Sequence, residues 1–174
     1  WLSSLRASLD RGVRRVQLRA RTLESNPRDV GRWRSLVERA VEACRAYDGT
    51  GVLINGDIER ANELGVGVHL RSTQLMALTT RPLPESRTVI ASCHSLEELQ
   101  RAQSLGCDAA VLGPVFETAS HPGMPGIGWN AFAEMRERVA LPIYAIGGMR
   151  EIRIPESRTH GAQGVAGIRG LWEG

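Results

Sequence analysis

The chain has 174 residues, of which 42% are hydrophobic and 24% are charged, as in ordinary globular domains. That length suffices to bury a core without help from disulfides or metals, so we expect a single domain over residues 1–174. No apolar run approaches the roughly 18 residues of a membrane span, and no segment resembles a signal peptide. These features predict a cytoplasmic protein that does not contact a membrane.

All 22 basic residues are arginine, and the sequence contains no lysine. Schiff-base aldolases, pyridoxal phosphate enzymes and P-loop proteins all need a lysine amine, so these three classes are excluded. Arginine instead offers a permanently charged fork that matches phosphate geometry. The arginines are dispersed among acidic residues, without a basic stripe carrying aromatics, and we expect no nucleic-acid partner.

The cysteines and histidines predict neither a disulfide framework nor a metal site. Cys44, Cys93 and Cys107 are widely spaced and odd in number, which favours free thiols in a reducing compartment. Cys93 has no evident base beside it, so we do not expect a thiolate nucleophile. The four histidines lack the spacing of metal ligands.

Short apolar runs alternate along the chain with segments of helical pattern. Helices are expected at 1–10, 27–47, 57–64, 96–105, 131–139 and 149–159, and strands at 15–19, 51–55, 67–70, 88–93, 109–113, 143–146 and 164–168. This alternation indicates βαβ units and a parallel sheet. Seven repeats favour an α/β fold of the TIM (β/α)8 barrel type over an open doubly wound sheet. The chain opens on a helix, so the first strand of the barrel is expected before Trp1.

Two helix starts carry recognisable capping residues. Asn26 followed by Pro27 is typical of a helix N-terminus. Ser95 followed by Glu98 is a capping box ahead of the helix at 96–105.

In a parallel barrel the active site is built from the carboxyl ends of the strands. Gln17 and Arg19 lie on one side of their strand, since side chains alternate, and Arg21 lies just beyond. Ser92 and His94 also share parity. The alternative for Arg19 and Arg21 is that they are solvated charges at the end of their strand. The alternative for His94 is that it only makes a structural hydrogen bond.

Glycine-rich stretches end the last two strands, at 145–148 and 167–170. Glycines there let backbone amides approach an anion, and a short helix near Arg169 would add its dipole, although such glycines also serve simple turns. The loop at 116–129 has the length and small residues of a cover over a ligand, or of a solvated excursion.

Four segments resemble the thiamine phosphate synthase and TenI-type thiazole tautomerase family: Gln17-Leu18-Arg19, ASCHS at 91–95, GPVFET at 113–118 and PIYAIGG at 142–148. The resemblance extends from Val16 to Leu171. It implies a barrel that binds a thiazole phosphate, with the phosphate at Gly147, Gly148, Gly167 and Ile168. The synthase joins this thiazole to a pyrimidine carried as its pyrophosphate, with magnesium assisting the departure of pyrophosphate.

Further residues match family positions that hold the pyrophosphate or lie in the active-site loop. These are Gln17, Arg19, Asn55 and Ser92, with Thr118 at the loop threonine, and Arg21 and His121 where the family has lysines. Arginine keeps the charge of a lysine, whereas a neutral histidine does not.

Three departures from the family concern the chemistry itself. Gly56 and Gln74 stand where the synthase has its two magnesium-binding aspartates, so Mg²⁺ is expected only if synthase activity persists, which these residues argue against. Asp57 lies next to one of these positions. Pro114 stands where the tautomerase has its catalytic histidine, and His94 is the nearest histidine that could replace it as a catalytic residue.

Two hypotheses therefore remain open. The chain is a synthase-like transferase or tautomerase-like isomerase of thiazole phosphate chemistry, or it is a non-catalytic ligand-binding or regulatory barrel. The closing sequence at 161–170 resembles the C-terminal part of fusions with a Nudix (MutT-like) nucleotide pyrophosphohydrolase, which would fit the second. Under both hypotheses the partner is a small phosphorylated thiazole or pyrimidine, together with a fused domain or a second copy of the chain.

Overall fold

The structure of the chain is a computed structural model that describes residues 1–20, 29–118, 123 and 125–172. Contacts between Cα atoms divide it into two compact units, which we describe separately. Unit 1 consists of Trp1–His69 and Leu83–Thr88, and unit 2 of Leu70–Pro82 and Val89–Glu173. Within the described ranges, no helix is both long and apolar enough to cross a membrane.

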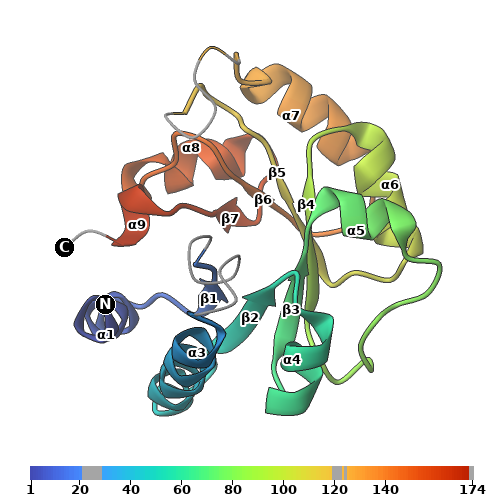
Figure 1. The fold of residues 1–174 in the computed structure, drawn as a ribbon. Helices are drawn as coiled ribbons and strands as arrows, with labels where there is room; N and C mark the ends of the chain where they lie inside the picture. The colour runs from blue at the N-terminus through green and yellow to red at the C-terminus, as the bar shows by residue number, and fades with distance from the viewer. Residues whose placement is uncertain (21–28, 119–122, 124, 173–174) are drawn as a thin grey trace. The chain divides into compact units, whose positions relative to one another are not determined.

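Unit 1 alternates helices and strands: α1 (Leu2–Asp10), β1 (Arg15–Leu18), α3 (Val30–Arg45), β2 (Gly51–Asn55), α4 (Ile58–Leu64) and β3 (Gly67–Leu70) (Figure 1). The strands are parallel and adjacent in chain order, with Val16 opposite Val52 and Leu53 opposite Gly67. The first strand alternates exposed and buried residues, whereas the second is buried along nearly its whole length. A strand with buried neighbours on both sides has no solvated face, which explains the continuous apolar run of β2.

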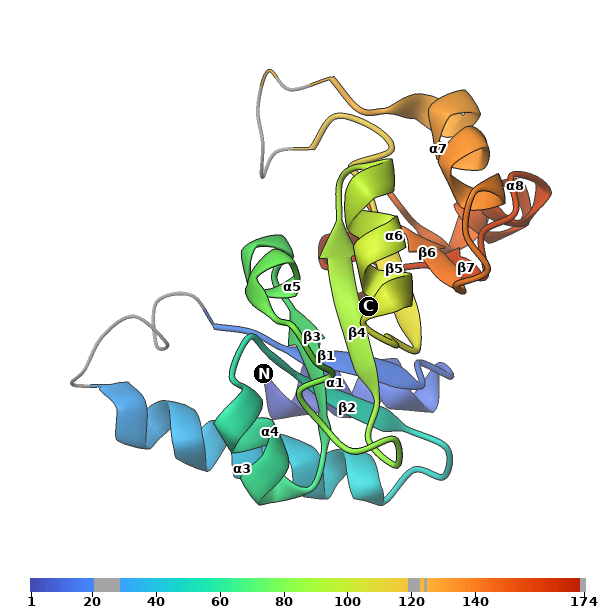
Figure 2. The same ribbon diagram turned by 90° about the vertical axis from the view of Figure 1, so that its right-hand side faces the viewer.

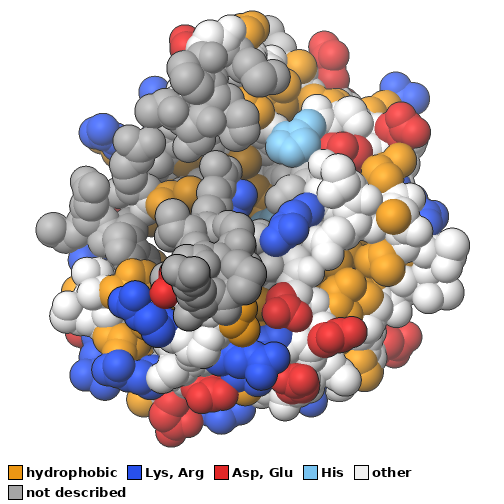
Figure 3. Space-filling view, in the orientation of Figure 1, with side chains coloured by type: hydrophobic (Ala, Val, Ile, Leu, Met, Phe, Trp, Pro, Cys, Tyr) orange, Lys and Arg blue, Asp and Glu red, His pale blue; other side chains and the backbone are white. Residues whose placement is uncertain are grey.

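The core of unit 1 joins apolar side chains of its helices and strands. Fully buried members include Leu5, Leu9, Val37, Ala40 and Ile54. On α3 and α4 the outward side chains are charged and partly paired, as Arg60 is with Glu38 and Glu63 at 2.5 and 2.8 Å. Figure 3 shows blue and red side chains interspersed over the α3 region, as the dispersed arginines predict.

Unit 2 continues the alternation of helices and strands. They are α5 (Ser72–Ala77), β4 (Val89–Cys93), α6 (Leu96–Ser104), β5 (Ala109–Leu112), α7 (Gly128–Glu137), β6 (Ile143–Ala145), η2 (Glu151–Arg153), α8 (Ile154–Thr159), β7 (Gly164–Val165) and α9 (Arg169–Trp172). The strands β4 to β7 are parallel neighbours in chain order. In Figure 2 α6 runs alongside β4, where its buried Leu99 and Ala102 face the sheet.

The structure confirms most of the expected elements, with shifts at their ends. Three strands end at the expected residue and four end one to three residues earlier, while the helix expected at 131–139 already begins at Gly128. The segment expected as one helix at 149–159 divides into η2 and α8, with proline in the first turn of α8. The expected helix start at Asn26 and Pro27 lies outside the described residues.

Within the described ranges, one helix is present that the sequence did not predict, α5. Its six residues bury only Leu75, so the segment has no apolar periodicity from which a helix could be predicted.

Candidate functional site

Polar side chains gather at the carboxyl ends of the strands of unit 1. The Nε2 of Gln17 on β1 donates a hydrogen bond of 2.8 Å to the Oδ1 of Asn55 at the end of β2. Asn55 pairs in register with His69 of β3, and both side chains are only 5% exposed. The structure therefore brings together Gln17 and Asn55, which were predicted from the sequence, and adds His69 beside them.

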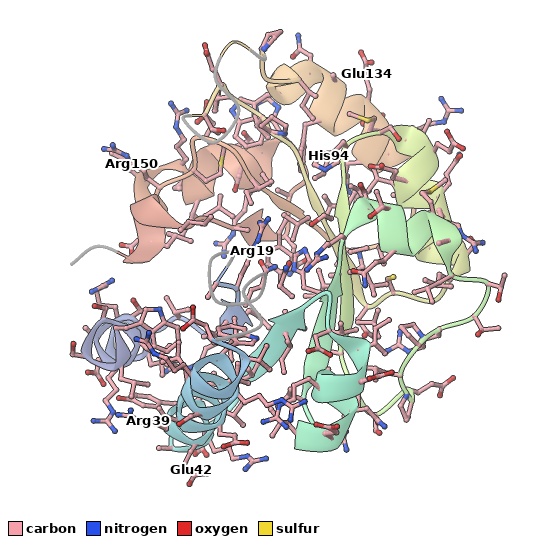
Figure 4. All side chains as sticks on the ribbon, viewed as in Figure 1. Arg19, Arg39, Glu42, His94, Glu134 and Arg150 are labelled. Atoms are coloured by element: carbon pink, nitrogen blue, oxygen red, sulfur yellow. The ribbon has the colours of Figure 1, made fainter. Side chains whose placement is uncertain are left out.

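The electrostatics of this cluster are set by burial and by Arg19, which projects beyond the end of β1 (Figure 4). Burial, with a smaller contribution from the positive charge of Arg19, lowers the pKa of His69 from 6.5 to about 4. His69 is therefore neutral at pH 7. The cluster presents one guanidinium with neutral hydrogen-bonding groups around it, a composition suited to an anion. Arg21, predicted to join it, lies outside the described residues.

The residues present do not fit the two-carboxylate magnesium site that the family resemblance implies. In unit 1 Gly56 has no side chain, and the Oδ1 of Asp57 accepts the backbone N–H of Arg60 at 2.9 Å as the cap of α4. In unit 2 the Oε1 of Gln74 accepts the backbone N–H of Arg71 at 3.2 Å. Across the described parts of the chain, no three His, Cys, Asp or Glu side chains form a group that could hold a metal.

His94 lies at the end of β4 in unit 2, where its ring is anchored to the next strand (Figure 4). Its Nδ1 lies 2.6 Å from the carbonyl oxygen of Gly113. A carbonyl can only accept, so Nδ1 carries the hydrogen, and in the neutral ring Nε2 keeps its lone pair. The ring is exposed. This geometry allows both roles that the sequence left open, a structural hydrogen bond through Nδ1 and proton transfer through Nε2.

The backbone of His94 is held by the predicted capping box, in a modified form. Ser95 Oγ accepts the N–H of Glu98 at 3.2 Å, as expected for the cap of α6. The carboxylate of Glu98 accepts the N–H of His94 at 2.5 Å, one residue before the usual position. The same cap therefore orients the histidine and starts the helix.

Ser92 is half-buried on β4, two residues before His94 and in register with Val111 of β5. Cys93 between them is fully buried, and burial raises the pKa of its thiol far above neutrality. The thiol is therefore protonated, which agrees with the expectation that Cys93 is no nucleophile.

The segments that follow β5 and β6 are joined by close backbone contacts. The N–H of Val115 donates to the carbonyl of Ile146 at 2.7 Å, and that of Phe116 to Gly147 at 3.3 Å. Gly147 has a φ of 98°, and a Cβ there would lie 2.7 Å from the Cα of Pro114. Only glycine permits this approach. Pro114 thus packs directly against the first glycine of the predicted phosphate site.

The second glycine stretch lies against the first. A Cβ on Gly170 would lie 2.3 Å from the carbonyl oxygen of Met149, and one on Gly167 would lie 3.4 Å from the same atom. Among the described residues, the N–H groups of Gly148, Gly167 and Ile168 donate to no backbone carbonyl. Gly148 is exposed, and Ile168 is 66% exposed. We call Gly147, Gly148, Gly167 and Ile168 the phosphate cradle, after the ligand that the sequence predicts for them.

The loop after β5 returns to the strand end before α7 begins. The N–H of Ile127 donates to the carbonyl of Pro114 at 2.9 Å, and a Cβ on Gly126 would lie 2.1 Å from the carbonyl oxygen of Val115. Thr118 is half-buried in the outgoing part of this loop. His121 and the tip of the expected cover lie outside the described residues.

Residues 1–171 match the family described as thiamine monophosphate synthase (TMP-TENI). The chain belongs to this family. A protein of Aquifex aeolicus provisionally named thiamine-phosphate synthase 2 is 34% identical over 170 residues, which cover 97% of this chain and 88% of that protein. A protein of Geobacter sulfurreducens, provisionally named thiamine-phosphate synthase, is 34% identical over 98% of this chain and 78% of its own length.

Solved structures show the same fold. The thiamine phosphate pyrophosphorylase of Pyrococcus furiosus superposes with a TM-score of 0.75 at 22% identity, over 96% of this chain and 78% of that one. A 3-hexulose-6-phosphate synthase superposes with a TM-score of 0.64 at 14% identity, over 95% of this chain and 84% of that one. The predicted α/β fold of the TIM (β/α)8 barrel type is thereby confirmed. The chain is a thiamine phosphate synthase-like domain of thiamine biosynthesis.

Proposed function

We propose that this domain binds a thiazole phosphate through the phosphate cradle of unit 2. The observation that carries the proposal is the set of backbone N–H groups of Gly148, Gly167 and Ile168, which donate to no carbonyl of the described chain and end two adjacent strands. Backbone amides at the carboxyl ends of the last two strands are the usual way in which a barrel holds a phosphate.

Two substitutions at Gly148 that differ from each other only in charge test this proposal. Gly148→Asp and Gly148→Asn have nearly the same shape, and both residues tolerate the positive φ of 69° better than other side chains do. A carboxylate beside the cradle should repel phosphate, so we expect thiazole phosphate affinity to fall about tenfold more in the Asp variant than in the Asn variant. Isothermal titration at pH 7.5 measures both dissociation constants.

The matched control for this pair is Gly106, which ends α6 with a φ of 76° and open space around its Cβ position. Gly106→Asp should bind thiazole phosphate as the native chain does. Equal affinities in the Gly148→Asp and Gly148→Asn variants would place the phosphate elsewhere and contradict the proposal.

We further propose that the domain does not catalyse the magnesium-assisted synthase reaction. Magnesium would supply charge stabilisation for the departing pyrophosphate, yet the two matched positions are Gly56 and a glutamine whose Oε1 accepts a backbone N–H. The neighbouring Asp57 caps α4. The domain would then act as an isomerase-like or ligand-binding member of its family.

A thiochrome fluorescence assay measures this second expectation directly. With hydroxymethylpyrimidine pyrophosphate, thiazole phosphate and Mg²⁺, the chain should form no thiamine phosphate above background, while an active synthase serves as positive control. Turnover that disappears in Arg19→Ala would show instead that carboxylates are dispensable and that the unit 1 cluster holds the pyrophosphate.

Other finer expectations stay predictions. They are the role of His94 as a proton acceptor, the pyrophosphate contacts of Gln17, Arg19, Asn55 and Ser92, and fusion to a Nudix hydrolase.

A further inference from the structure

An open hollow of about 570 Å³ adjoins the phosphate cradle in unit 2. Its lining consists of Gly148, Arg150, Ile152, Arg153 and Glu156, and we call it the arginine hollow. Gly148 belongs both to the hollow and to the cradle, so a group bound by the cradle amides lies at the edge of the hollow.

One of the two arginines is fixed in place by its neighbours. The guanidinium carbon of Arg153 lies 4.3 Å from the centre of the Phe116 ring, and its Nη1 lies 2.8 Å from the Oε2 of Glu156. Phe116 in turn lies close to Gly148, because a Cβ on that glycine would lie 3.0 Å from the Cβ of Phe116. Arg153 therefore forms a positioned wall of the hollow, with its charge largely balanced by Glu156.

The other arginine keeps its charge uncompensated. Arg150 follows the cradle glycines by two residues and lies beside the second glycine stretch, since a Cβ on Gly170 would lie 3.0 Å from its Cγ. It is exposed and forms no ion pair with any carboxylate in the described part of the chain. Figure 4 shows it projecting beside α8 and α9. The hollow thus carries one net positive charge next to a site for a single phosphate.

We propose that the phosphate end of this site accepts a diphosphate ester, with the first phosphate on the cradle amides and the terminal phosphate on Arg150. A monophosphate uses only the cradle and leaves this guanidinium in water. A second phosphate reaches it and forms charge-assisted hydrogen bonds, which a planar guanidinium makes well. This inference rests on the proposed phosphate cradle and extends it to a ligand class with two linked phosphates.

The test compares two probes, thiazole phosphate and the corresponding thiazole diphosphate, by isothermal titration in the Arg19→Ala background. That substitution removes the guanidinium of unit 1, where a diphosphate could also bind. We expect the diphosphate to bind on the order of tenfold more tightly, the factor that one charge-assisted hydrogen bond supplies. Arg150→Gln should abolish this preference and leave the monophosphate affinity unchanged within a factor of about two.

Two further variants make the result specific. Arg158→Gln removes an exposed arginine of α8 that does not line the hollow, and it should keep the full preference for the diphosphate. Arg150→Lys keeps the charge and should keep most of the preference, which also shows that position 150 tolerates substitution.

The outcomes separate this inference from the proposed function. Equal affinity of the Arg19→Ala chain for both probes, or an unchanged preference in Arg150→Gln, would overturn the diphosphate proposal while leaving the cradle intact. Binding of neither probe would overturn both.

Discussion

The hydrogen bonds that a side chain already makes decide whether it can also contact a ligand in this domain. Asp57 has the right chemistry for a metal and lies next to a family metal position, but its Oδ1 accepts the N–H of Arg60. Gln74 similarly accepts the N–H of Arg71. At both positions a side chain that could contact a ligand instead caps a helix, which is why residue type alone does not identify a site.

His69 should make the stability of the chain depend on pH. Its pKa is about 4 in the folded chain and 6.5 when unfolded, so the unfolded chain takes up a proton first as the pH falls. The free energy of unfolding should therefore be highest above pH 6.5 and decrease between pH 6.5 and 4, by about 2 kcal/mol at pH 5.

Urea unfolding of the native chain and of His69→Gln between pH 7.5 and 5 measures this contribution. The glutamine variant cannot titrate at this position, so the difference between the two curves isolates the histidine from the carboxylates. Parallel curves would mean that His69 has the same pKa in the folded chain as in the unfolded chain, and would contradict its burial.

Among the elements, α6 shows most clearly how local sequence positions a functional group. Its cap joins Ser95, Glu98 and His94 through two hydrogen bonds, and the His94 ring is anchored to the carbonyl of Gly113. The same hydrogen bonds therefore start the helix and hold the candidate proton acceptor His94 in place.

Removing the cap should destabilise the chain more than removing another serine of the same helix. Ser95→Ala loses the acceptor for the Glu98 N–H and should lower the free energy of unfolding by about 1 kcal/mol. Ser104→Ala is the control, because its exposed Oγ donates only to the Arg101 carbonyl at the other end of α6, and it should change stability by less than about 0.5 kcal/mol. Urea denaturation compares the two, and equal losses would refute the cap.

At the scale of the whole molecule, each of the two units has its own buried core and its own buried thiols. Cys44 lies in unit 1, whereas Cys93 and Cys107 lie in unit 2, and none is more than 7% exposed. Burial raises the pKa of Cys44 and of Cys107 to about 11. All three thiols are protonated and shielded at neutral pH.

Thiol modification should consequently report on unfolding. With Ellman's reagent at pH 7.5, the native chain should react only as fast as it opens, and three thiols should react at once in 6 M guanidinium chloride, a concentration expected to unfold most domains. Separate rates for the thiols of the two units would show that the units open independently. Rapid reaction of the folded chain would contradict the burial of these side chains.

The sequence by itself determined the alternation of strands and helices, the family and the two glycine stretches that we propose as a phosphate cradle. These features depend on local hydrophobic patterns and short motifs, which can be recognised without knowing which residues are neighbours in space. The placement of Gln17 and Arg19 on one side of their strand was also predictable, because side chains alternate along a strand.

Only the tertiary structure decided which of these residues meet. The bond between Gln17 and Asn55, the burial of His69 and the approach of Arg150 to Gly170 all depend on segments far apart in the chain. The missed helix α5 has a single buried residue and so left no periodic signal. Strand register and packing are set by contacts across many residues, and for that reason no local pattern contains them.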